Sequence, residues 1–395
     1  MLLAHKIALD PNAAQRLYFD RAAGTARFAW NWALAEWQRQ YKAGGRPSEV
    51  SLRRDLNAIK RAEFPWMYDV TKAAVQEAII DLGTAFRAFF EKRGRYPRFK
   101  RKDDRQSFCA ANEAGTFRAA GQRIKLPIVG WVRMREAVRF SGQLKRATVA
   151  CEAGRWFVAV MVETDDIKPV VHLAAEVGAD LGVSALATLS TGEVIEGPKA
   201  HKTALKKLRR ANKAQARKRR GSANFRKAKR RLARLHQRIA AIRRDALHKL
   251  TTRLTKTYAV IGLEDLNVRG MVQNRHLARA IADMGFFEFR RQIEYKARLY
   301  GARVVFANRF YPSSKTCSCC GVVKETLALA ERMFRCDDCG FEIERDHNAA
   351  LNLARLAASS AVTACREARS GAAPRSRVKR ASAKQEETPD LAAAA

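Results

Sequence analysis

The sequence predicts a multidomain α+β protein with a zinc ribbon near its carboxyl terminus. The length of 395 residues corresponds to roughly two or three domains of about 100–200 residues each. Apolar residues recur at helical spacing from Pro11 to about Arg93, and strand-like alternation follows from about Phe108 to Glu163. Two Cys-x-x-Cys-Gly motifs after residue 316 predict the ribbon.

The amino-terminal half is expected to combine one strand, a helical region and a β-rich region. Residues 1–8 alternate weakly and predict a lone strand ahead of the helices. The segment 94–102 then breaks the helical pattern and sets Tyr96 and Phe99 among basic residues. Aromatic rings next to cations suit stacking and phosphate contacts, so this segment favours nucleic acid slightly over a plain basic loop.

The carboxyl-terminal half alternates strands with helices and ends in a polar tail. The tail from about Ala358 onward is rich in Ala, Ser, Arg and Lys, which predicts disorder because little apolar surface is available to bury. The other expected elements are a strand hairpin at 175–197, two basic helices over 199–256 hinged near Gly221, a buried strand at 258–264, an amphipathic helix at 276–300, a strand at 302–307 and a helix from Asn348.

The charge of the chain indicates a polyanionic partner. The 76 Lys and Arg residues against 39 Asp and Glu give a net charge of +37. A chain this basic repels itself unless a polyanion neutralises it, so nucleic acid is the expected partner and a membrane surface is the weaker alternative. The basic helices carry 21 Lys and Arg but a single acid between Lys199 and Lys249. Solvated faces usually mix both signs, so phosphate binding is favoured there.

The cysteine motifs predict a structural zinc site. Cys317 and Cys320 form one Cys-x-x-Cys-Gly motif, and Cys336 and Cys339 form the other. Cys319 lies between the first pair and is expected to be a spare thiol, because pairing Cys317 with Cys320 mirrors the second motif. Zinc binding by four thiolates also fits a reducing compartment better than a disulfide framework does.

Three carboxylates predict a catalytic centre for divalent metals. Asp180 and Glu264 end predicted strands, and Asp346 precedes a predicted helix shortly after the second cysteine motif. Carboxylates gathered at one point repel each other unless cations neutralise them, and hard oxygen ligands suit Mg²⁺ or Mn²⁺. Two such ions support phosphodiester hydrolysis, which is the RNase H/RuvC pattern of nuclease chemistry.

Each acid also has a plainer interpretation when it is considered alone. Asp180 could be a turn aspartate or could bind a nucleotide phosphate, as similar strand ends do in actin-like ATPases. Asp265 could replace Glu264, and Asp346 could be only the N-cap of its helix. Their occurrence together in one basic chain favours the catalytic interpretation.

Several motifs along residues 1–355 make the chain similar to the TnpB family of insertion-sequence proteins, which is related to type V CRISPR effectors. The motifs are Tyr96-Pro-Arg-Phe-Lys, Gly178-Ala-Asp-Leu-Gly-Val, Leu247-His-Lys-Leu-Thr-Thr, Gly262-Leu-Glu-Asp-Leu-Asn-Val, Tyr311-Pro-Ser-Ser-Lys-Thr-Cys-Ser and Arg345-Asp-His-Asn-Ala-Ala-Leu-Asn. The resemblance implies an RNA-guided DNA endonuclease in the prokaryotic cytoplasm, associated with the nucleoid when it is bound to DNA. Its partners would be a guide RNA from the transposon end and double-stranded target DNA beside a short transposon-adjacent motif.

The resemblance also implies a domain plan and the site residues. A helical recognition lobe (10–105) is inserted in a wedge-like β-barrel (1–9 and 106–172). An RNase H/RuvC-like α/β nuclease domain (173–311 and 341–357) follows, with an embedded zinc ribbon (312–340) that binds target nucleic acid and a disordered basic tail (358–395). Asp180, Glu264 and Asp346 would be the catalytic acids that hold Mg²⁺ or Mn²⁺. The zinc ligands would be Cys317, Cys320, Cys336 and Cys339.

Two other functions compete with this interpretation. A transposase-like recombinase would need a strand-transfer nucleophile, and the sequence has no obvious tyrosine motif of that kind. A non-catalytic regulator of the insertion sequence would need no carboxylate cluster. The presence of all three acids therefore favours the nuclease.

Overall fold

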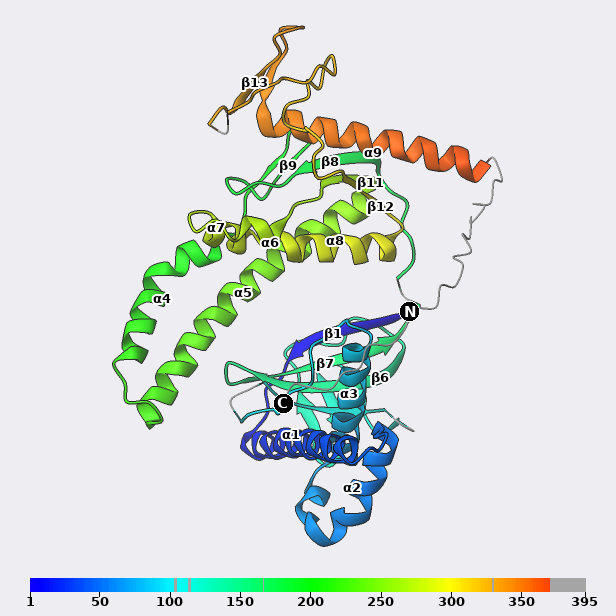
Figure 1. The fold of residues 1–395 in the computed structure, drawn as a ribbon, viewed down its shortest axis with the longest axis vertical. Helices are drawn as coiled ribbons and strands as arrows, with labels where there is room; N and C mark the ends of the chain where they lie inside the picture. Colours follow the sequence, from blue (N-terminus) through cyan, green and yellow to red (C-terminus); the bar gives the residue numbers. More distant parts are fainter. Residues whose placement is uncertain (103–104, 113–114, 166, 329, 370–395) are drawn as a thin grey trace, which may run out of the picture.

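The computed structural model describes residues 1–102, 105–112, 115–165, 167–328 and 330–369, with the backbone alone over 361–369. Figure 1 shows an amino-terminal lobe, drawn in blue and cyan, and a carboxyl-terminal lobe, drawn from green to red. A long helical hairpin, formed by α4 and α5, extends from the carboxyl-terminal lobe on one side of the space between the two lobes. The mixed α/β, multidomain class predicted from the sequence is confirmed.

Helices form one side of the amino-terminal lobe. They are α1 (Ala13–Lys42), α2 (Glu49–Glu63), the short 3-10 helix η1 (Pro65–Asp69) and α3 (Lys72–Phe90). Asn12 starts α1 through a capping box with Gln15, and Ser48 caps α2 in the same way. α1 packs against α3, and the ring of Trp37 stacks on Phe86 with 4.0 Å between centroids. The predicted helical region is confirmed as three helices in one apolar core.

Two antiparallel sheets form the other side of this lobe. The four-stranded sheet has the order β1-β7-β6-β2 and the three-stranded sheet has the order β3-β4-β5. Their bounds are β1 (Leu2–Ala8), β2 (Gln106–Ala111), β3 (Arg118–Ala120), β4 (Arg123–Leu126), β5 (Gly130–Arg133), β6 (Gln143–Glu152) and β7 (Arg155–Glu163).

The expected β-barrel is not closed within the part of the chain that the structure describes. One isolated bridge, Leu9 to Met134, links the two sheets, and β1 and β2 remain the edges of the larger one. Phe108 of β2 meets Phe19 of α1 with 5.8 Å between ring centroids. The sheet therefore buries its apolar side chains against helices, so this burial does not require the sheet to close into a barrel.

A five-stranded sheet forms the centre of the carboxyl-terminal lobe. Its order is β10-β9-β8-β11-β12, in which β8, β11 and β12 are parallel and β9 is antiparallel to β8. Helix α9 covers one face, and α5 and α8 lie along the other (Figure 1). The strand bounds are β8 (Ala174–Asp180), β9 (Ala187–Leu189), β10 (Val194–Ile195), β11 (Tyr258–Glu264) and β12 (Arg303–Ala307).

The helices between these strands follow the predicted order with one correction. α4 (Ala200–Ala216) and α5 (Ala223–Thr257) form the expected hairpin. The single helix expected over 276–300 is instead α7 (Ala278–Met284) and α8 (Phe286–Tyr300), and a short α6 (Val268–Met271) precedes them. The break falls at Gly285, whose φ of 76° is the left-handed conformation that ends a helix.

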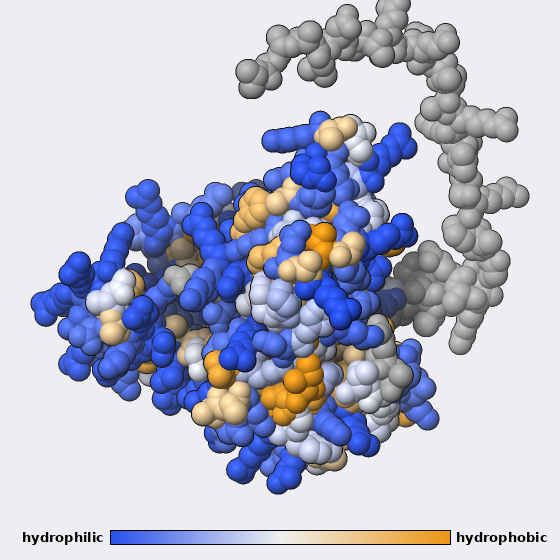
Figure 2. Space-filling model, turned by 90° about the horizontal axis from the view of Figure 1, so that it is seen from below, coloured by the Kyte–Doolittle hydropathy of each residue, from blue (hydrophilic) through white to orange (hydrophobic). Residues whose placement is uncertain are grey.

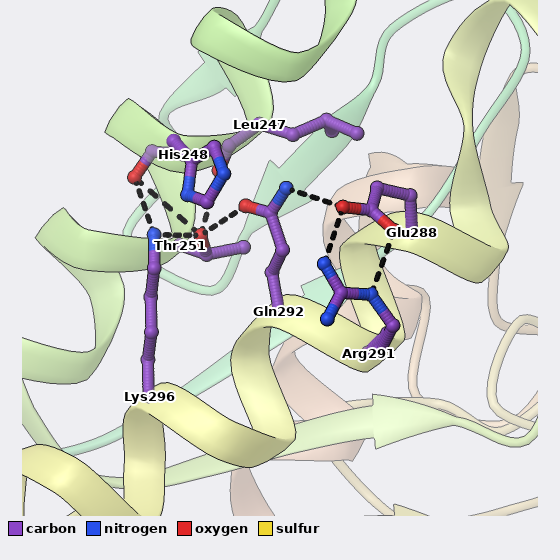
Figure 3. Close-up of polar contacts among 7 residues, drawn as sticks. All are labelled: Leu247, His248, Thr251, Glu288, Arg291, Gln292 and Lys296. Carbon is purple, nitrogen blue, oxygen red and sulfur yellow. Dashed lines mark hydrogen bonds and ion pairs between the residues drawn. The ribbon is translucent and has the colours of Figure 1, made fainter. Parts of the chain in front are cut away.

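Helices α5 and α8 are joined by a buried polar network (Figure 3). The ammonium of Lys296 donates to the carbonyl of His248 and to the hydroxyl of Thr251, each at 2.8 Å. It also donates to the hydroxyl of Thr252 at 2.8 Å. Gln292 lies 3.1 Å from the Thr251 hydroxyl and donates to Glu288. All three donors of the buried ammonium are thus satisfied, so the network fixes α5 against α8.

The chain ends in a long helix that follows a small hairpin. β13 (Met333–Arg335) pairs with β14 (Glu342–Glu344), and α9 (Arg345–Arg369) begins directly after them. Helix α9 continues beyond residue 358, so the beginning of the predicted disordered tail is helical; residues 370–395 lie outside the described part. The alanine-rich sequence explains the extension, because alanine has the highest helix propensity. None of the described helices is long and apolar enough to cross a membrane.

Candidate functional site

Two of the three predicted catalytic acids lie side by side at one edge of the central sheet. Asp180 is the last residue of β8, and Glu264 is the last residue of β11. The two strands are parallel, and Leu263 pairs with Ala179 in their register. The next residues of both strands are Glu264 and Asp180, so their carboxylates leave the sheet at the same level.

The third acid reaches this edge from α9. Asp346 is the second residue of the helix, inside its first turn, and its position argues against an N-cap role. Helix α9 packs across β8, β11 and β12. This packing sets the start of the helix over the end of β8, where Asp180 lies.

Two glycines allow the helix to approach the sheet this closely. A methyl group on Gly178 would lie 1.9 Å from the carbonyl oxygen of Ala350, and one on Gly262 would lie 2.2 Å from the carbonyl oxygen of Leu353. Any larger side chain would push α9 away from the strands. The space beside Gly178 is therefore filled by the backbone of α9.

The three carboxylates are near enough for Glu264 and Asp346 to act electrostatically on Asp180. Burial first, and then the charges of Glu264 and Asp346, raise the pKa of Asp180 to about 8. Arg345 opposes this effect. Three carboxylates crowded in this way repel each other, and a divalent cation would relieve that repulsion.

Glu264 and its neighbour Asp265 have different surroundings, which resolves the choice between them. Asp265 forms ion pairs with Arg290 and with Arg309, and the hydrogen bond from Arg290 lowers its pKa. Glu264 has no such ion pair among the described contacts and accepts a hydrogen bond from the hydroxyl of Ser313. Asp265 therefore ties α8 to the loop after β12, whereas Glu264 faces Asp180.

Arginines near Asp346 were not identified from the sequence. The guanidinium of Arg345 lies 3.0 Å from one carboxylate oxygen of Asp346, and Arg332 lies 3.9 Å from the other. Arg345 also donates to the carbonyl of Glu331. These contacts hold the first turn of α9 against the hairpin before it, and the only sequence signal was the adjacency of Arg345 and Asp346.

The four predicted ligand cysteines converge on one point. Their sulfur atoms all lie within 4.8 Å of one another, with 3.7 Å between Cys317 and Cys339 and 3.6 Å between Cys320 and Cys336. Four thiolates around a tetrahedral zinc ion at ~2.3 Å would lie about 3.8 Å apart, so the cluster fits zinc. Cys319 is exposed, and its side chain does not belong to the cluster.

Asparagines of α9 connect the cysteine cluster to the carboxylates. Asn348 accepts a hydrogen bond from the backbone N–H of Ser318 at 2.9 Å and donates to the carbonyl of Thr316 at 2.7 Å. Asn352 donates to the carbonyls of Ser313 and Thr316. The loop that carries Cys317 is therefore bound to the same helix that carries Asp346.

A second acid near the sheet has a structural role. Asp283 is buried and accepts hydrogen bonds from the backbone N–H groups of His201 and Lys202 at 2.9 to 3.1 Å. These are the free donors at the start of α4, and a carboxylate there interacts favourably with the helix dipole. Asp283 therefore fixes the base of the basic hairpin and does not join the catalytic acids.

A basic cleft of about 1970 Å³ lies between the two lobes. One wall comes from β1 and β7, and the other comes from α5 and α8. Arginines of α5 line it at helical spacing, including Arg230, Arg234 and Arg238. The molecule seen from below is also mainly hydrophilic, with small apolar patches (Figure 2). This cleft suits a phosphate backbone.

The aromatic and basic segment after α3 is held firmly against the helices. Trp30 donates to the carbonyl of Arg98, and the ammonium of Lys100 lies 3.5 Å from the centroid of the Trp30 ring. Tyr96 packs edge-on against Phe86 at 5.5 Å. Part of this predicted contact segment is therefore structural, although Tyr96 and Phe99 remain about half exposed.

Carboxylates at the edge of a mixed sheet, a cysteine cluster that fits zinc and a basic cleft are features of nucleic-acid-processing proteins. Sequence comparison then shows the family. The OrfB_IS605 profile, described as "Probable transposase", matches residues 159–275; the Cas12f1-like TNB domain matches 286–353; and a helix-turn-helix domain matches 1–46.

Curated relatives extend the match over almost the whole chain. A protein of Streptomyces pristinaespiralis named "Putative RNA-guided DNA endonuclease" is 38% identical over 388 residues, covering 97% of this chain and 96% of the relative. The InsQ protein of Escherichia coli (strain K12), with the same description, is 34% identical and covers 93% and 94%. The chain therefore belongs to the IS605 OrfB (TnpB) family.

A solved structure supports the fold. In the cryo-EM structure of a Cas12f1–sgRNA–target DNA complex, the protein aligns with a TM-score of 0.54 at 16% identity, over 86% of this chain and 83% of that one. At this identity the likeness shows a shared fold and nothing finer.

Proposed function

We propose that this protein is a transposon-associated, RNA-guided DNA endonuclease. It binds a guide RNA derived from the transposon end and cuts double-stranded DNA beside a short adjacent motif. The observation that carries the proposal is the position of Asp180 and Glu264 at the ends of neighbouring parallel strands, with Asp346 near enough to act electrostatically on Asp180. Membership of a family whose curated relatives carry this description supports it.

The three carboxylates are the proposed ligands of Mg²⁺ or Mn²⁺. Such ions, when bound, activate a water molecule and stabilise the leaving oxygen of a phosphodiester. Asp180 and Glu264 supply rigid ligands because each ends a paired strand, and Asp346 adds a third ligand from α9. Ser313 orients Glu264 through its hydrogen bond. The raised pKa of Asp180 supports a bound cation, because the charged form needs such a partner to be favourable.

The domain plan inferred from the sequence remains part of this proposal. The strand order β10-β9-β8-β11-β12 supports an RNase H/RuvC-like domain over 173–311 and 341–357. The cysteine cluster supports a zinc ribbon over 312–340 that binds target DNA. The helices over 10–105 act as the recognition lobe, and the sheets of 1–9 and 106–172 act as the wedge-like part.

The basic cleft is the proposed path of the RNA. Its α5 wall carries arginines at successive turns, and its other wall carries Lys6 and Arg155. Phosphate contacts of this kind position a nucleic acid without reading its bases. Guide pairing would then select the target, as in RNA-guided effectors in general.

The test is guided cleavage by the purified complex. RNA that co-purifies with the protein is sequenced, and DNA that matches its guide is offered with a randomised flanking segment and Mg²⁺. Asp180→Ala, Glu264→Ala and Asp346→Ala should each abolish cutting and leave RNA binding nearly intact. Glu196→Ala is the control, because Glu196 is an exposed acid after β10 and lies outside the cleft lining.

Two results would refute the proposal. If the wild-type complex cuts no guide-matched DNA with any flanking motif, the protein is not a guided nuclease. If it binds such DNA and represses it without cutting, the non-catalytic regulator is correct. Strand transfer by a variant that lacks all three acids would favour the transposase-like recombinase instead.

A further inference from the structure

One aromatic side chain next to the carboxylates has no structural role in the part of the chain that the structure describes. Phe310 is 87% exposed, more than any other Phe, Tyr or Trp in that part. Exposed apolar residues are common singly, so exposure alone carries no conclusion. The position and the rigidity of Phe310 are what make it informative.

Phe310 lies on a loop that touches Glu264 at both ends. Ala307, the last residue of β12, pairs with Glu264 in the register of β11 and β12. Ser313, at the other end of the loop, donates its hydroxyl hydrogen bond to the carboxylate of Glu264. The loop between these two residues therefore projects beside the proposed metal ligands.

The loop is held in one conformation by its own contacts. The side chain of Asn308 accepts from the backbone N–H of Phe310 at 3.0 Å, and its carbonyl accepts from the N–H of Tyr311 at 2.8 Å. Arg309 forms an ion pair with Asp265 at 3.3 Å. With both neighbours anchored, the ring of Phe310 is presented to solvent by a fixed backbone.

We propose that the ring of Phe310 stacks on a base of the DNA strand next to the bond that is cut. The inference rests on the proposed function, because it needs a DNA strand in the site. The strand must leave its duplex to enter the site, so its bases lose their own stacking partners. A preformed aromatic surface replaces that stacking for any base, and such contacts are sequence-tolerant. Phe310 is thus a substrate-positioning residue beside the catalytic acids.

The experiment combines variants of Phe310 with abasic DNA. The guided complex is offered targets in which single abasic nucleotides are scanned on both sides of the cleaved bond. Phe310→Ala should slow cleavage of intact DNA roughly 5- to 100-fold, the range for loss of one stacked base. Phe310→Trp should retain the rate. One abasic position should slow the wild type by a similar factor and should slow Phe310→Ala no further, because the lost contact is the same.

Leu173→Ala is the matched control for removing an exposed apolar side chain. Leu173 is 88% exposed and precedes β8 at the end away from Asp180. This variant should cut at the wild-type rate and keep the wild-type abasic profile.

Two outcomes would overturn the inference while the proposed function stands. One is a Phe310→Ala complex that cuts like the wild type. The other is a slow Phe310→Ala complex that every abasic position slows as it slows the wild type, which would indicate a structural role. If the wild-type complex cuts no guided DNA, the proposed function and the inference fail together.

Discussion

The hydroxyl of Ser313 donates a hydrogen bond to the carboxylate of Glu264, across 49 positions of sequence. Ser313 is buried and precedes Cys317 in the same loop, and its own carbonyl accepts a hydrogen bond from Asn352 of α9. One residue thus contacts the end of β11 and the helix that carries Asp346. The cysteine cluster and the carboxylates are therefore parts of one packed unit, and disturbing the loop between them should affect both.

Asn352→Leu should destabilise the protein by about 1–3 kcal/mol, because the buried carbonyl of Ser313 loses its donor. The carbonyl of Thr316 loses one of its two donors and keeps Asn348. Chemical denaturation measures the change in the free energy of unfolding. Asn212→Leu, on the exposed face of α4, is the control and should stay within about 0.5 kcal/mol. A neutral Asn352→Leu would show that the loop does not depend on α9.

Asp180→Asn should stabilise the metal-free protein by about 1–3 kcal/mol at neutral pH, since folding of the wild type must either bury the Asp180 charge or bind a proton to neutralise it. The folded pKa of Asp180 is about 8, against about 4 in an unfolded chain. Between these values the native state binds more protons, so the stability of the wild type falls as pH rises. The melting temperature of the variant should therefore fall less than that of the wild type between pH 4 and pH 8.

Magnesium provides the check on that result. Mg²⁺ should raise the melting temperature of the wild type and have little effect on Asp180→Asn, because ligand binding to the native state alone is stabilising. Asp245→Asn, an exposed acid, should behave like the wild type in both measurements. If Asp180→Asn melts at a lower temperature without metal, Asp180 forms a stabilising contact that the carboxylate geometry does not reveal.

Cys320→Ser and Cys336→Ser should lose zinc and unfold the segment around the cluster, because metal binding contributes directly to folding in such sites. Elemental analysis and thermal melts with and without a chelator measure this. Cys319→Ser is the control and should keep its zinc, since its side chain lies outside the cluster. Soluble wild-type protein without zinc would rule out the ribbon, and zinc loss in Cys319→Ser would reassign the ligands.

Lys296→Met should cost about 1–3 kcal/mol, because the hydroxyls of Thr251 and Thr252 and the carbonyl of His248 lose their buried donor. Thr251→Val should cost a similar amount. The double variant should cost less than the sum of the two, since both changes remove the same contact. Lys249→Met, exposed on α5, should be neutral. Strict additivity would mean that the two side chains do not interact.

Replacing Arg230, Arg234 and Arg238 together by Gln should weaken RNA binding and reduce its salt dependence. Each phosphate contact contributes about 0.7 to the slope of log affinity against log salt for single strands, so the slope should fall by about 2. Binding is measured at several salt concentrations. Arg217, Arg219 and Arg220 lie at the tip of the hairpin, outside the cleft lining, and their triple Gln variant should change the slope less. If the tip variant lowers the salt slope more than the cleft variant does, the RNA lies along the tip of the hairpin.

The sequence predicted the positions of the site residues well because local rules governed them. Strand alternation placed Asp180 and Glu264 at strand ends, and cysteine spacing identified all four cluster residues. The catalytic assignment of the acids stays a prediction until cleavage is measured. What the sequence missed depends on contacts between distant segments: Ser313 beside Glu264, Asn352 beside the loop, and the two arginines on Asp265.

The corrections have physical causes as well. Gly285 was included in one long amphipathic helix because a single glycine weakens a helical pattern without excluding it. The close packing of α9 on Gly178 was not predicted, because a sequence does not show which backbone will pack against a glycine. A barrel closes when its edge strands pair with each other. Here the edge strand β2 packs against α1 and α3 instead.

The order of the site residues along the chain has a consequence for synthesis. The ribosome translates the whole of α4 and α5, with the proposed RNA-binding surface, before it reaches Asp346. Asp180 and Glu264 are translated before α9, which packs closely on Gly178 and Gly262 and carries the third acid, Asp346. On the proposed assignment of the site, the hairpin that binds RNA is synthesised before the third metal ligand. Guide loading during translation would precede the capacity to cut.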